Sequence, residues 1–219
     1  MLHGYLSQKE SFAWQIKFFS RYYRVIAPDM TGFGENKGMS YPYSLCDYAD
    51  EIIRLVDELK IKEYDVLAHS FGARVAVKIA NRDERADRIV FTGAAGLKPR
   101  RGLKYLFKRA SFLLLKRLVP REKLAKFYSS DYRSLSPVMK ESFKKIVAEN
   151  LDDEVKRIQN KCLVISGKAD RETPPESQRK YARYIKNSER VFIKGAGHFC
   201  FSEKPDEFNG AVFAFLSGG

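Results

Sequence analysis

Short apolar runs alternate along this chain with longer stretches whose apolar positions recur at helical spacing. The runs are five to eight residues long, which is typical of strands buried on both faces of a parallel sheet. They are 22–29, 63–69, 87–93, 161–167 and 190–194. The helical stretches are 44–60, 71–81, 175–185 and 207–216. This alternation predicts an α/β fold with a mostly parallel central sheet flanked by helices.

The alternation is interrupted between residues 97 and 150, where the strand pattern disappears and the sequence is helical and charged in character. Within this stretch, residues 98–126 hold eleven Lys or Arg and one acid, Glu122, interleaved with Leu and Phe. We therefore expect a core made of residues 1–96 and 151–219. A helical cap or lid, made of residues 97–150, would be inserted over the sheet.

The composition is that of one globular domain. The chain has 219 residues, of which 44% are hydrophobic, enough for a sizeable core. No apolar run reaches the roughly 18 residues that span a bilayer, and Met1–Tyr5 lack a signal-peptide pattern. Cys46, Cys162 and Cys200 show no C-x-x-C spacing, and the three histidines do not cluster. We expect a cytoplasmic protein without a disulfide framework, a metal site or a cofactor.

A serine stands where the second strand run ends and a helix begins. Small residues lie two positions before and after Ser70, at Ala68 and Gly72, and they permit a sharp turn that exposes the hydroxyl. Phe71 is first in the helix, so its backbone N–H can be directed at a developing oxyanion. A serine at a helix start is also a common N-cap, and the turn alone leaves both interpretations open.

A serine nucleophile needs a base, and the base needs an acid that holds its tautomer. His198 and Asp170 each follow an apolar strand run, so both are expected at the same edge of the sheet as Ser70. His69 adjoins the serine and is expected to point to the opposite side of the turn. The structural alternatives are a loop histidine for His198 and an Asx turn or cap for Asp170. Glu172 is a competing acid, less favoured by its position in the turn.

Taken together and in this order, these motifs resemble the α/β-hydrolase superfamily, in its cap-bearing, serine esterase-like branch. The motifs are His3-Gly4-Tyr5, the loop Ala27–Gly34, the turn at Ser70, the turn at Asp170 and the loop Gly195–His198. The resemblance covers essentially the whole chain. It implies a catalytic triad of Ser70, Asp170 and His198. It also implies an oxyanion hole formed by the N–H groups of Tyr5 and Phe71.

Two features depart from the family pattern. Ala68 replaces the first glycine of the usual turn, a change that the family tolerates. Only Met1 and Leu2 precede His3, whereas in the family His-Gly directly follows the third strand, which is central in the sheet. The first three strands are therefore expected to be missing, which would leave backbone groups unpaired and apolar faces exposed. The hypothesis is an N-terminally shortened enzyme, or a sheet whose gap is filled by another chain.

The expected reaction is hydrolysis of a small-molecule carboxylic ester, or of a thioester or amide, through an acyl-enzyme. Met30, Phe33 and Phe199 are expected to line a pocket for an apolar acyl group, although core packing is the alternative for the aromatic residues. A serine nucleophile disfavours dehalogenase and epoxide hydrolase chemistry, because those relatives use aspartate. The alternative functions are a catalytically silent or truncated binding protein, and a lyase or perhydrolase that uses the same triad.

The net charge of +13 bears on partners rather than on the fold. Most of the excess lies in the expected cap, which could dock on an anionic lipid surface or steer an anionic substrate; a solvated lid is the simpler interpretation. No nucleic-acid recognition module is visible, so no nucleic-acid partner is expected. The sequence leaves the oligomeric state open, an oligomer included.

Overall fold

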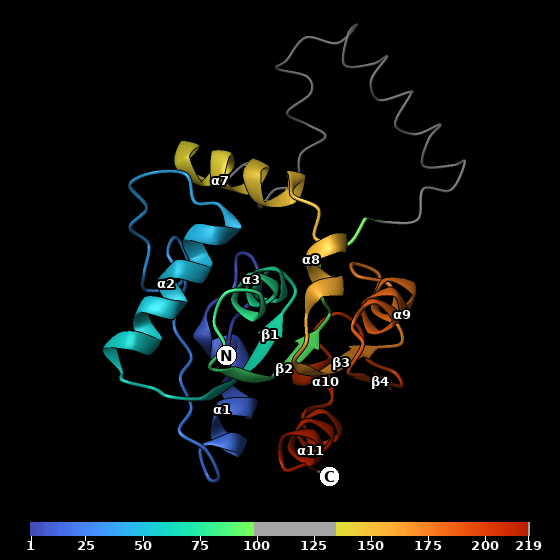
Figure 1. Ribbon diagram of the computed structural model, residues 1–219. Coiled ribbons are helices and arrows are strands. Elements are labelled where there is room, and N and C mark those ends of the chain that lie inside the picture. Colours follow the sequence, from blue (N-terminus) through green and yellow to red (C-terminus); the bar gives the residue numbers. More distant parts are fainter. Residues whose placement is uncertain (99–134, 219) are drawn as a thin grey trace, which may run out of the picture.

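Four parallel strands form the central sheet of the computed structural model, which describes residues 1–98 and 135–218 (Figure 1). They lie side by side in chain order: β1 (Tyr64–His69), β2 (Ala86–Thr92), β3 (Lys161–Gly167) and β4 (Ser188–Ile193). Because all four strands run in the same direction, the loops that follow them meet at one edge of the sheet.

Helices cover both faces of the sheet and complete a three-layer sandwich (Figure 1). Successive strand residues point to opposite faces, so Val66, Ile89 and Val164 belong to one apolar core. Helices over that face are α2 (Leu45–Glu58), α3 (Phe71–Ala80), α7 (Pro137–Ala148), α8 (Asp152–Arg157) and α9 (Pro175–Tyr184). The second core lies beneath the 3-10 turn Lys9–Phe12, α1 (Ala13–Phe19), α10 (Cys200–Glu203) and α11 (Pro205–Leu216).

Most of the expected elements are confirmed, and one strand is wrong. The four helical stretches and four of the five strand runs correspond to α2, α3, α9, α11 and β1–β4. Residues 22–29 were expected as a strand but have no regular secondary structure. A strand needs a ladder partner, and between Arg24 and Pro28 the described backbone receives one hydrogen bond, from the Met1 amine to the Ile26 carbonyl at 2.6 Å.

Leu2 occupies the flank of β1 beside this segment. Its N–H donates to the Leu67 carbonyl at 2.8 Å, and its carbonyl accepts from the His69 N–H at 2.9 Å. This parallel bridge, centred on Ala68, holds Leu2 at the open edge of the sheet. Residues 22–29 therefore do not pair directly with β1, and the N-terminal segment stays beside the start of α3.

Gly72 allows the N-terminal segment to cross α3 closely. A β-carbon at this position would collide with the backbone carbonyls of Leu2 and His3, so no larger residue fits without a shift of the segment. The small residue expected to permit the turn at Ser70 thus also seats the crossing chain.

Part of the expected cap lies outside the described residues. Residues 99–134, with most of the basic run, are not described. The described remainder of the stretch includes α7, which packs over the α2 and α3 side of the molecule (Figure 1). Its Ser142 hydroxyl donates to the Tyr43 carbonyl, and the Arg74 guanidinium donates to the Ile146 carbonyl. Among the described helices, none is long and apolar enough to cross a membrane.

Helix α2 begins with a capping box. The Ser44 hydroxyl accepts the Asp47 N–H at 3.3 Å, and the Asp47 carboxylate accepts the Ser44 N–H at 2.6 Å. Two N–H groups that lack partners inside the helix are satisfied reciprocally. The helix then buries Leu45, Tyr48, Ala49, Ile52 and Val56 against the sheet.

Loss of this cap should destabilise the fold. Replacement of Ser44 by Ala should lower the free energy of unfolding by about 1 kcal/mol, because the Asp47 N–H loses its acceptor. The measurement is urea unfolding followed by circular dichroism. Ser40→Ala changes an exposed serine outside the helix and should stay within about 0.5 kcal/mol of the parent. Equal effects of the two substitutions would contradict the role of the cap.

Candidate active site

Ser70 sits on a strained turn between β1 and α3. Its backbone has φ 52° and ψ −104°, a conformation that costs a non-glycine residue roughly 1–3 kcal/mol. Two hydrogen bonds hold it there: the Ser70 N–H donates to the Thr92 carbonyl at 3.0 Å, and its carbonyl accepts from the Ala95 N–H at 3.4 Å. The serine side chain makes no cap to α3. The N-cap alternative is therefore not supported, and the half-buried residue stands at the carboxyl edge of the sheet.

Asp170 and His198 are brought together at the same edge. The His198 Nδ1 lies 2.9 Å from the Asp170 Oδ2, and both side chains are shielded from solvent, with 9% and 0% of the side-chain surface exposed. Backbone hydrogen bonds join their two loops, from the Ala169 N–H to the Ala196 carbonyl at 2.9 Å and from the Lys168 N–H to the Ile193 carbonyl at 2.9 Å. The pair is thus held by main chain as well as by side chains.

The surroundings of Asp170 favour its ionised form. Burial acts to raise the pKa of Asp170, but hydrogen bonds from His198 and from the Thr173 N–H outweigh it and keep the pKa below its ordinary value. The Thr173 hydroxyl donates to Oδ2 at 2.8 Å, and the N–H groups of Glu172 and Thr173 donate to Oδ1 at 2.9 Å each. These N–H contacts form the Asx-type turn considered for Asp170. Since an ionised carboxylate only accepts, His198 Nδ1 is the donor in this contact, and Nε2 is the nitrogen that can accept in a neutral ring.

His69 connects the serine turn to the histidine loop. Its ring lies 4.7 Å from the His198 ring, and its Nε2–H donates to the His198 carbonyl at 3.1 Å. The side chain is 2% exposed, and burial, followed by repulsion from His198, lowers the pKa of His69 to about 3. The expectation that the ring points to the opposite side of the turn from Ser70 stays a prediction; the ring packs against the histidine loop. Sequence spacing gave no indication of this contact.

Gly93 lets the loop after β2 approach His198 closely. It has φ 52°, and a β-carbon there would lie 3.1 Å from the His198 ring. Because Thr92 accepts the Ser70 N–H, the end of β2 links Ser70 to His198. No hydrogen bond joins the Ser70 hydroxyl to His198 Nε2 in the described part of the chain. Catalytic contacts of this kind often shorten only in the complex with substrate.

The residues expected to supply oxyanion donors flank Ser70. A β-carbon on Gly4 would lie 3.7 Å from the Ser70 Cβ, so the loop that carries Tyr5 borders the serine. The Tyr5 ring packs against Phe33 and Phe71 at 4.9 and 5.5 Å, and its hydroxyl donates to the Met139 carbonyl at 3.3 Å. Phe71 is the first residue of α3, so its N–H lies at the positive end of the helix dipole.

The three residues expected to line the substrate pocket have different environments. Phe199 is 45% exposed and packs 5.4 Å from the His198 ring. Phe33 is buried beside the rings of Tyr5 and Phe71. Met30 is fully buried in the core, and its N–H donates to a nitrogen of His3 at 3.1 Å. Phe199 is the one of the three that solvent reaches freely.

Local structure accounts for the competing acid Glu172 and for Asp29 in the loop Ala27–Gly34. Glu172 is exposed and contributes its backbone N–H to Asp170. Asp29 accepts the N–H groups of Lys9 and Glu35 at 2.7 and 3.0 Å and pairs with the Lys9 ammonium, contacts that shape its loop. Within residues 1–98 and 135–218, no group of three or more His, Cys, Asp or Glu side chains is arranged to hold a metal ion.

The buried Asp170 carboxylate should make stability depend on pH. Its folded-state pKa is depressed, so its stabilisation is complete above the unfolded pKa of about 3.9 and is lost as the pH falls through the folded pKa. In urea unfolding, the difference in unfolding free energy between the parent and Asp170→Asn should be largest near pH 6. It should decrease as the pH falls from about 5 to 3. A difference that stays constant or widens with acid would contradict this assignment.

Comparison with known proteins agrees with the fold. A family model described as "Alpha/beta hydrolase family" matches residues 1–211. A 2-hydroxymuconate semialdehyde hydrolase of Pseudomonas putida is 27% identical, over 89% of this chain and 77% of that protein. A meta-cleavage product hydrolase structure from Pseudomonas fluorescens superposes with a TM-score of 0.72 at 26% identity, covering 96% of this chain and 86% of that one. An enol-lactonase structure from Burkholderia xenovorans, at 24% identity and a TM-score of 0.75, shares the fold over 99% of this chain and 90% of that one. This chain belongs to the α/β hydrolase family.

Proposed function

We propose that this hydrolase cleaves a carboxylic ester through a covalent intermediate on Ser70. The observation that carries the proposal is the 2.9 Å contact between His198 Nδ1 and a buried Asp170 carboxylate, on loops beside the strained turn that bears Ser70. An aspartate that fixes the histidine tautomer leaves Nε2 to act as base toward a hydroxyl. Each residue thus has a role that follows from its own surroundings.

In the first half of the reaction the Ser70 oxygen attacks the ester carbonyl carbon, and its proton passes to His198 Nε2. The carbonyl π electrons move onto oxygen and form a tetrahedral oxyanion. When this intermediate collapses, the bond between carbon and the leaving oxygen breaks, and His198 returns the proton to the departing alkoxide. The products are an alcohol and an acyl group bound to Ser70. Asp170 stabilises the imidazolium in between.

In the second half water replaces the alcohol. His198 takes a proton from water, whose oxygen attacks the acyl carbon. Collapse of the second tetrahedral oxyanion breaks the bond to Ser70, and His198 gives the proton back to the serine oxygen. The N–H groups of Tyr5 and Phe71 are the proposed donors to both oxyanions, and loss of one such donor typically costs about 10²- to 10³-fold in rate.

The aromatic side chains around the site favour a substrate with an apolar acyl group. Phe199 is exposed next to His198, and the Tyr5 ring packs with Phe33, Phe71 and, at 5.0 Å, Phe143 of α7. In this proposal residues 97–150 form a cap, of which α7 is a described part. Phe199 and Phe33 border the acyl group. Met30 is fully buried, so its proposed role is to support the loop Ala27–Gly34.

A second candidate substrate class comes from the relatives. Two of the similar proteins are hydrolases of 2-hydroxymuconate semialdehyde and of a meta-cleavage product. We propose the same Ser70, His198 and Asp170 arrangement as the candidate machinery for hydrolysis of substrates of this class. A panel that pairs p-nitrophenyl esters of increasing chain length with 2-hydroxymuconate semialdehyde separates the two classes by the ratio of their kcat/KM values.

Covalent labelling tests whether the site is assembled. A fluorophosphonate probe should add once to the parent protein, as read by intact mass, and should not add to Ser70→Ala. Ser202→Ala, which changes an exposed serine, is the matched control and should label like the parent. Absence of an adduct on a folded parent would contradict the proposal and favour a catalytically silent binding protein.

Kinetics on the preferred ester should separate the roles of Ser70 and Asp170. Ser70→Ala should lower kcat by a factor on the order of 10⁶. Asp170→Asn should lower it by about 10⁴-fold, because the histidine would adopt the wrong tautomer. KM should change little in both variants, since neither removes substrate contacts. A decrease in kcat of less than tenfold in either variant would contradict the role assigned to that residue.

A further inference from the structure

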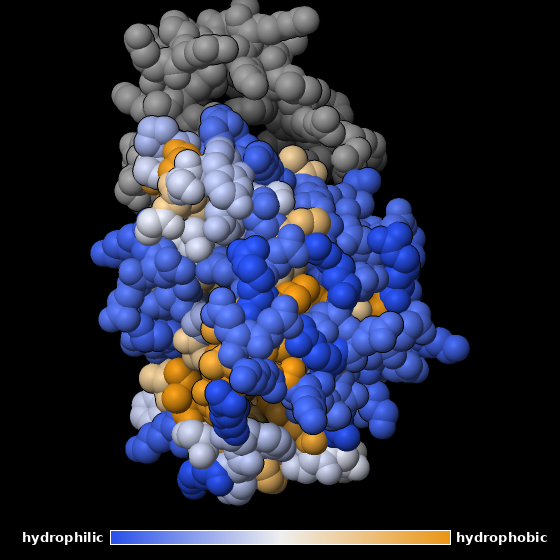
Figure 2. All heavy atoms as spheres, turned by 60° about the vertical axis from the view of Figure 1, so that its left-hand side comes forward, coloured by the Kyte–Doolittle hydropathy of each residue, from blue (hydrophilic) through white to orange (hydrophobic). Residues whose placement is uncertain are grey.

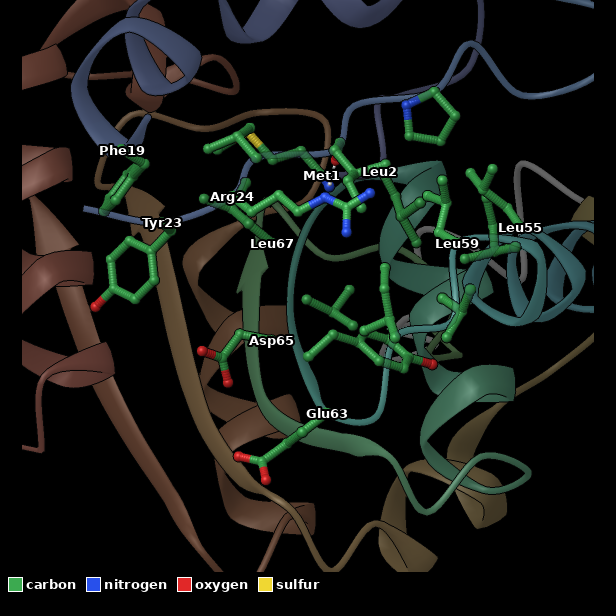
Figure 3. Close-up of a pocket in the computed structure, with 18 of the residues that line it drawn as sticks. Met1, Leu2, Phe19, Tyr23, Arg24, Leu55, Leu59, Glu63, Asp65 and Leu67 are labelled. Atoms are coloured by element: carbon green, nitrogen blue, oxygen red, sulfur yellow. Dashed lines mark hydrogen bonds between the residues drawn. The ribbon is translucent and has the colours of Figure 1, made fainter. Parts of the chain in front are cut away.

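A hollow beside β1 is separate from the candidate site. It has a volume of about 450 Å³ and lies between β1, one face of α2 and the segment 22–29 (Figure 3). Figure 2 shows hydrophobic atoms gathered at the surface on the side of the molecule that carries α1 and α2. None of Ser70, Asp170 and His198 lines this hollow. The contacts that relate these three residues to one another therefore lie elsewhere, in the core under the carboxyl edge of the sheet.

The loops at this edge are joined by main-chain hydrogen bonds in two pairs. The Ser70 N–H donates to the Thr92 carbonyl, between the turn after β1 and the end of β2. The Ala169 N–H donates to the Ala196 carbonyl, between the loops after β3 and β4. The first pair carries the proposed nucleophile, and the second carries the proposed acid and base. The distance between the nucleophile and the base therefore depends on what connects the two pairs.

A buried glutamine makes such a connection. Gln178 is fully buried and lies in α9, which packs against β3 and β4 (Figure 1). Its Nε2 donates to the Ala94 carbonyl at 3.0 Å and to the Thr173 carbonyl at 3.3 Å, and its Oε1 accepts the Ala94 N–H at 3.1 Å. Ala94 belongs to the loop after β2, and Thr173 belongs to the turn after β3. One carboxamide thus joins the two pairs of loops.

Each partner of this carboxamide lies one contact from a candidate residue. The residue after Ala94 donates its N–H to the Ser70 carbonyl at 3.4 Å. Thr173 donates its N–H to Asp170 Oδ1 at 2.9 Å and its hydroxyl to Oδ2 at 2.8 Å. A displacement of Ala94 from Thr173 would therefore move the serine turn relative to the carboxylate that contacts the histidine.

The three backbone groups restrict which side chain fits at this position. The Ala94 N–H needs an acceptor, and the Ala94 and Thr173 carbonyls need donors; in the described part of the chain none of the three has a backbone partner. A carboxamide offers an acceptor and two N–H donors in one plane. A carboxylate would turn lone pairs toward both carbonyls, and an apolar side chain would leave three buried groups unsatisfied. Of these three kinds of side chain, only the carboxamide satisfies every partner.

We infer that Gln178 is a positioning residue for the proposed reaction and holds the serine turn in register with the aspartate and the histidine. The inference rests on the proposed roles of Ser70, Asp170 and His198. A misplacement of about 1 Å caused far from the reacting atoms can cost about 10²-fold in rate. Loss of the carboxamide should therefore slow acylation. It should leave KM nearly unchanged, because the side chain is fully buried behind the loops.

A pair of matched variants tests the inference. Gln178→Met keeps the length of the side chain and removes all three hydrogen bonds. Gln15→Met makes the same change at another fully buried glutamine, in α1, whose partners are Phe201 and Asn209. Gln178→Met should lower the rate of fluorophosphonate labelling, and kcat on the preferred ester, by about 10- to 100-fold. Gln15→Met should label at the parent's rate. Equal decreases in the two variants would overturn the inference, because a general loss of packing would then explain both.

Nuclear magnetic resonance separates this inference from the proposed function. The His198 Nδ1 proton in the contact with Asp170 should give a downfield signal, which Asp170→Asn assigns by its loss. Gln178→Met should shift or broaden this signal, and Gln15→Met should leave it in place. These changes in a parent that fails to label would contradict the proposed function and support the positioning role. An unchanged signal and an unchanged labelling rate in Gln178→Met would overturn the inference alone.

Two further measurements apply if Gln178→Met does not fold. Gln178→Glu keeps the acceptor for the Ala94 N–H, and its carboxyl supplies one donor when protonated and none when ionised. Its labelling rate relative to the parent's should therefore fall as the pH rises through the titration of that carboxyl; a ratio independent of pH would contradict the inference. In the parent, the Gln178 side-chain amide protons should exchange slowly with deuterium. Exchange as fast as that of the exposed Gln8 amide would overturn the inference as well.

Discussion

Backbone hydrogen bonds between the loops that follow the strands hold this structure together at the carboxyl edge of the sheet, where the candidate site lies. The Thr92 carbonyl at the end of β2 accepts the Ser70 N–H, and the Ala169 N–H donates to the Ala196 carbonyl between the loops that follow β3 and β4. These bonds join four loops in two pairs, the loops after β1 and β2 and the loops after β3 and β4. Main-chain bonds of this kind do not depend on side-chain rotamers, so they can hold a strained residue such as Ser70 in place.

In the described sheet, β1 has a neighbouring strand on one side only. A central strand would ordinarily have partners on both sides, and here Leu2 supplies the pairing only at the end nearest Ser70. That short contact is enough to keep the Gly4–Tyr5 loop beside the serine, because Gly72 lets the chain pass over α3. The remaining edge faces an apolar groove. The placement of the candidate site thus depends on this N-terminal segment.

Local patterns in the sequence were sufficient to predict most of the fold and the position of Asp170 and His198 at one edge of the sheet, while the catalytic roles of Ser70, Asp170 and His198 stay predictions. Strand runs buried on both faces and an amphipathic α2 are properties of neighbouring residues, and a chain of parallel strands places the loops after them on one edge. The segment 22–29 was mispredicted because its apolar run satisfies a strand pattern, whereas strand formation requires a partner that the described sheet does not provide. The contact between His69 and His198 could not be predicted, because it joins residues 129 positions apart. Residues 99–134 lie outside the described chain and leave the basic part of the expected cap without structural information.

The central claim is that Ser70 carries the acyl group between the two halves of the reaction, and trapping that species tests it most directly. The protein would be mixed with p-nitrophenyl acetate, quenched in acid within the first turnover, digested and mapped by mass spectrometry. The account predicts an acetyl group on the peptide that contains Ser70, which accumulates at the rate of the p-nitrophenol burst. An acetyl group on another residue, or hydrolysis without any acylated peptide, would contradict it.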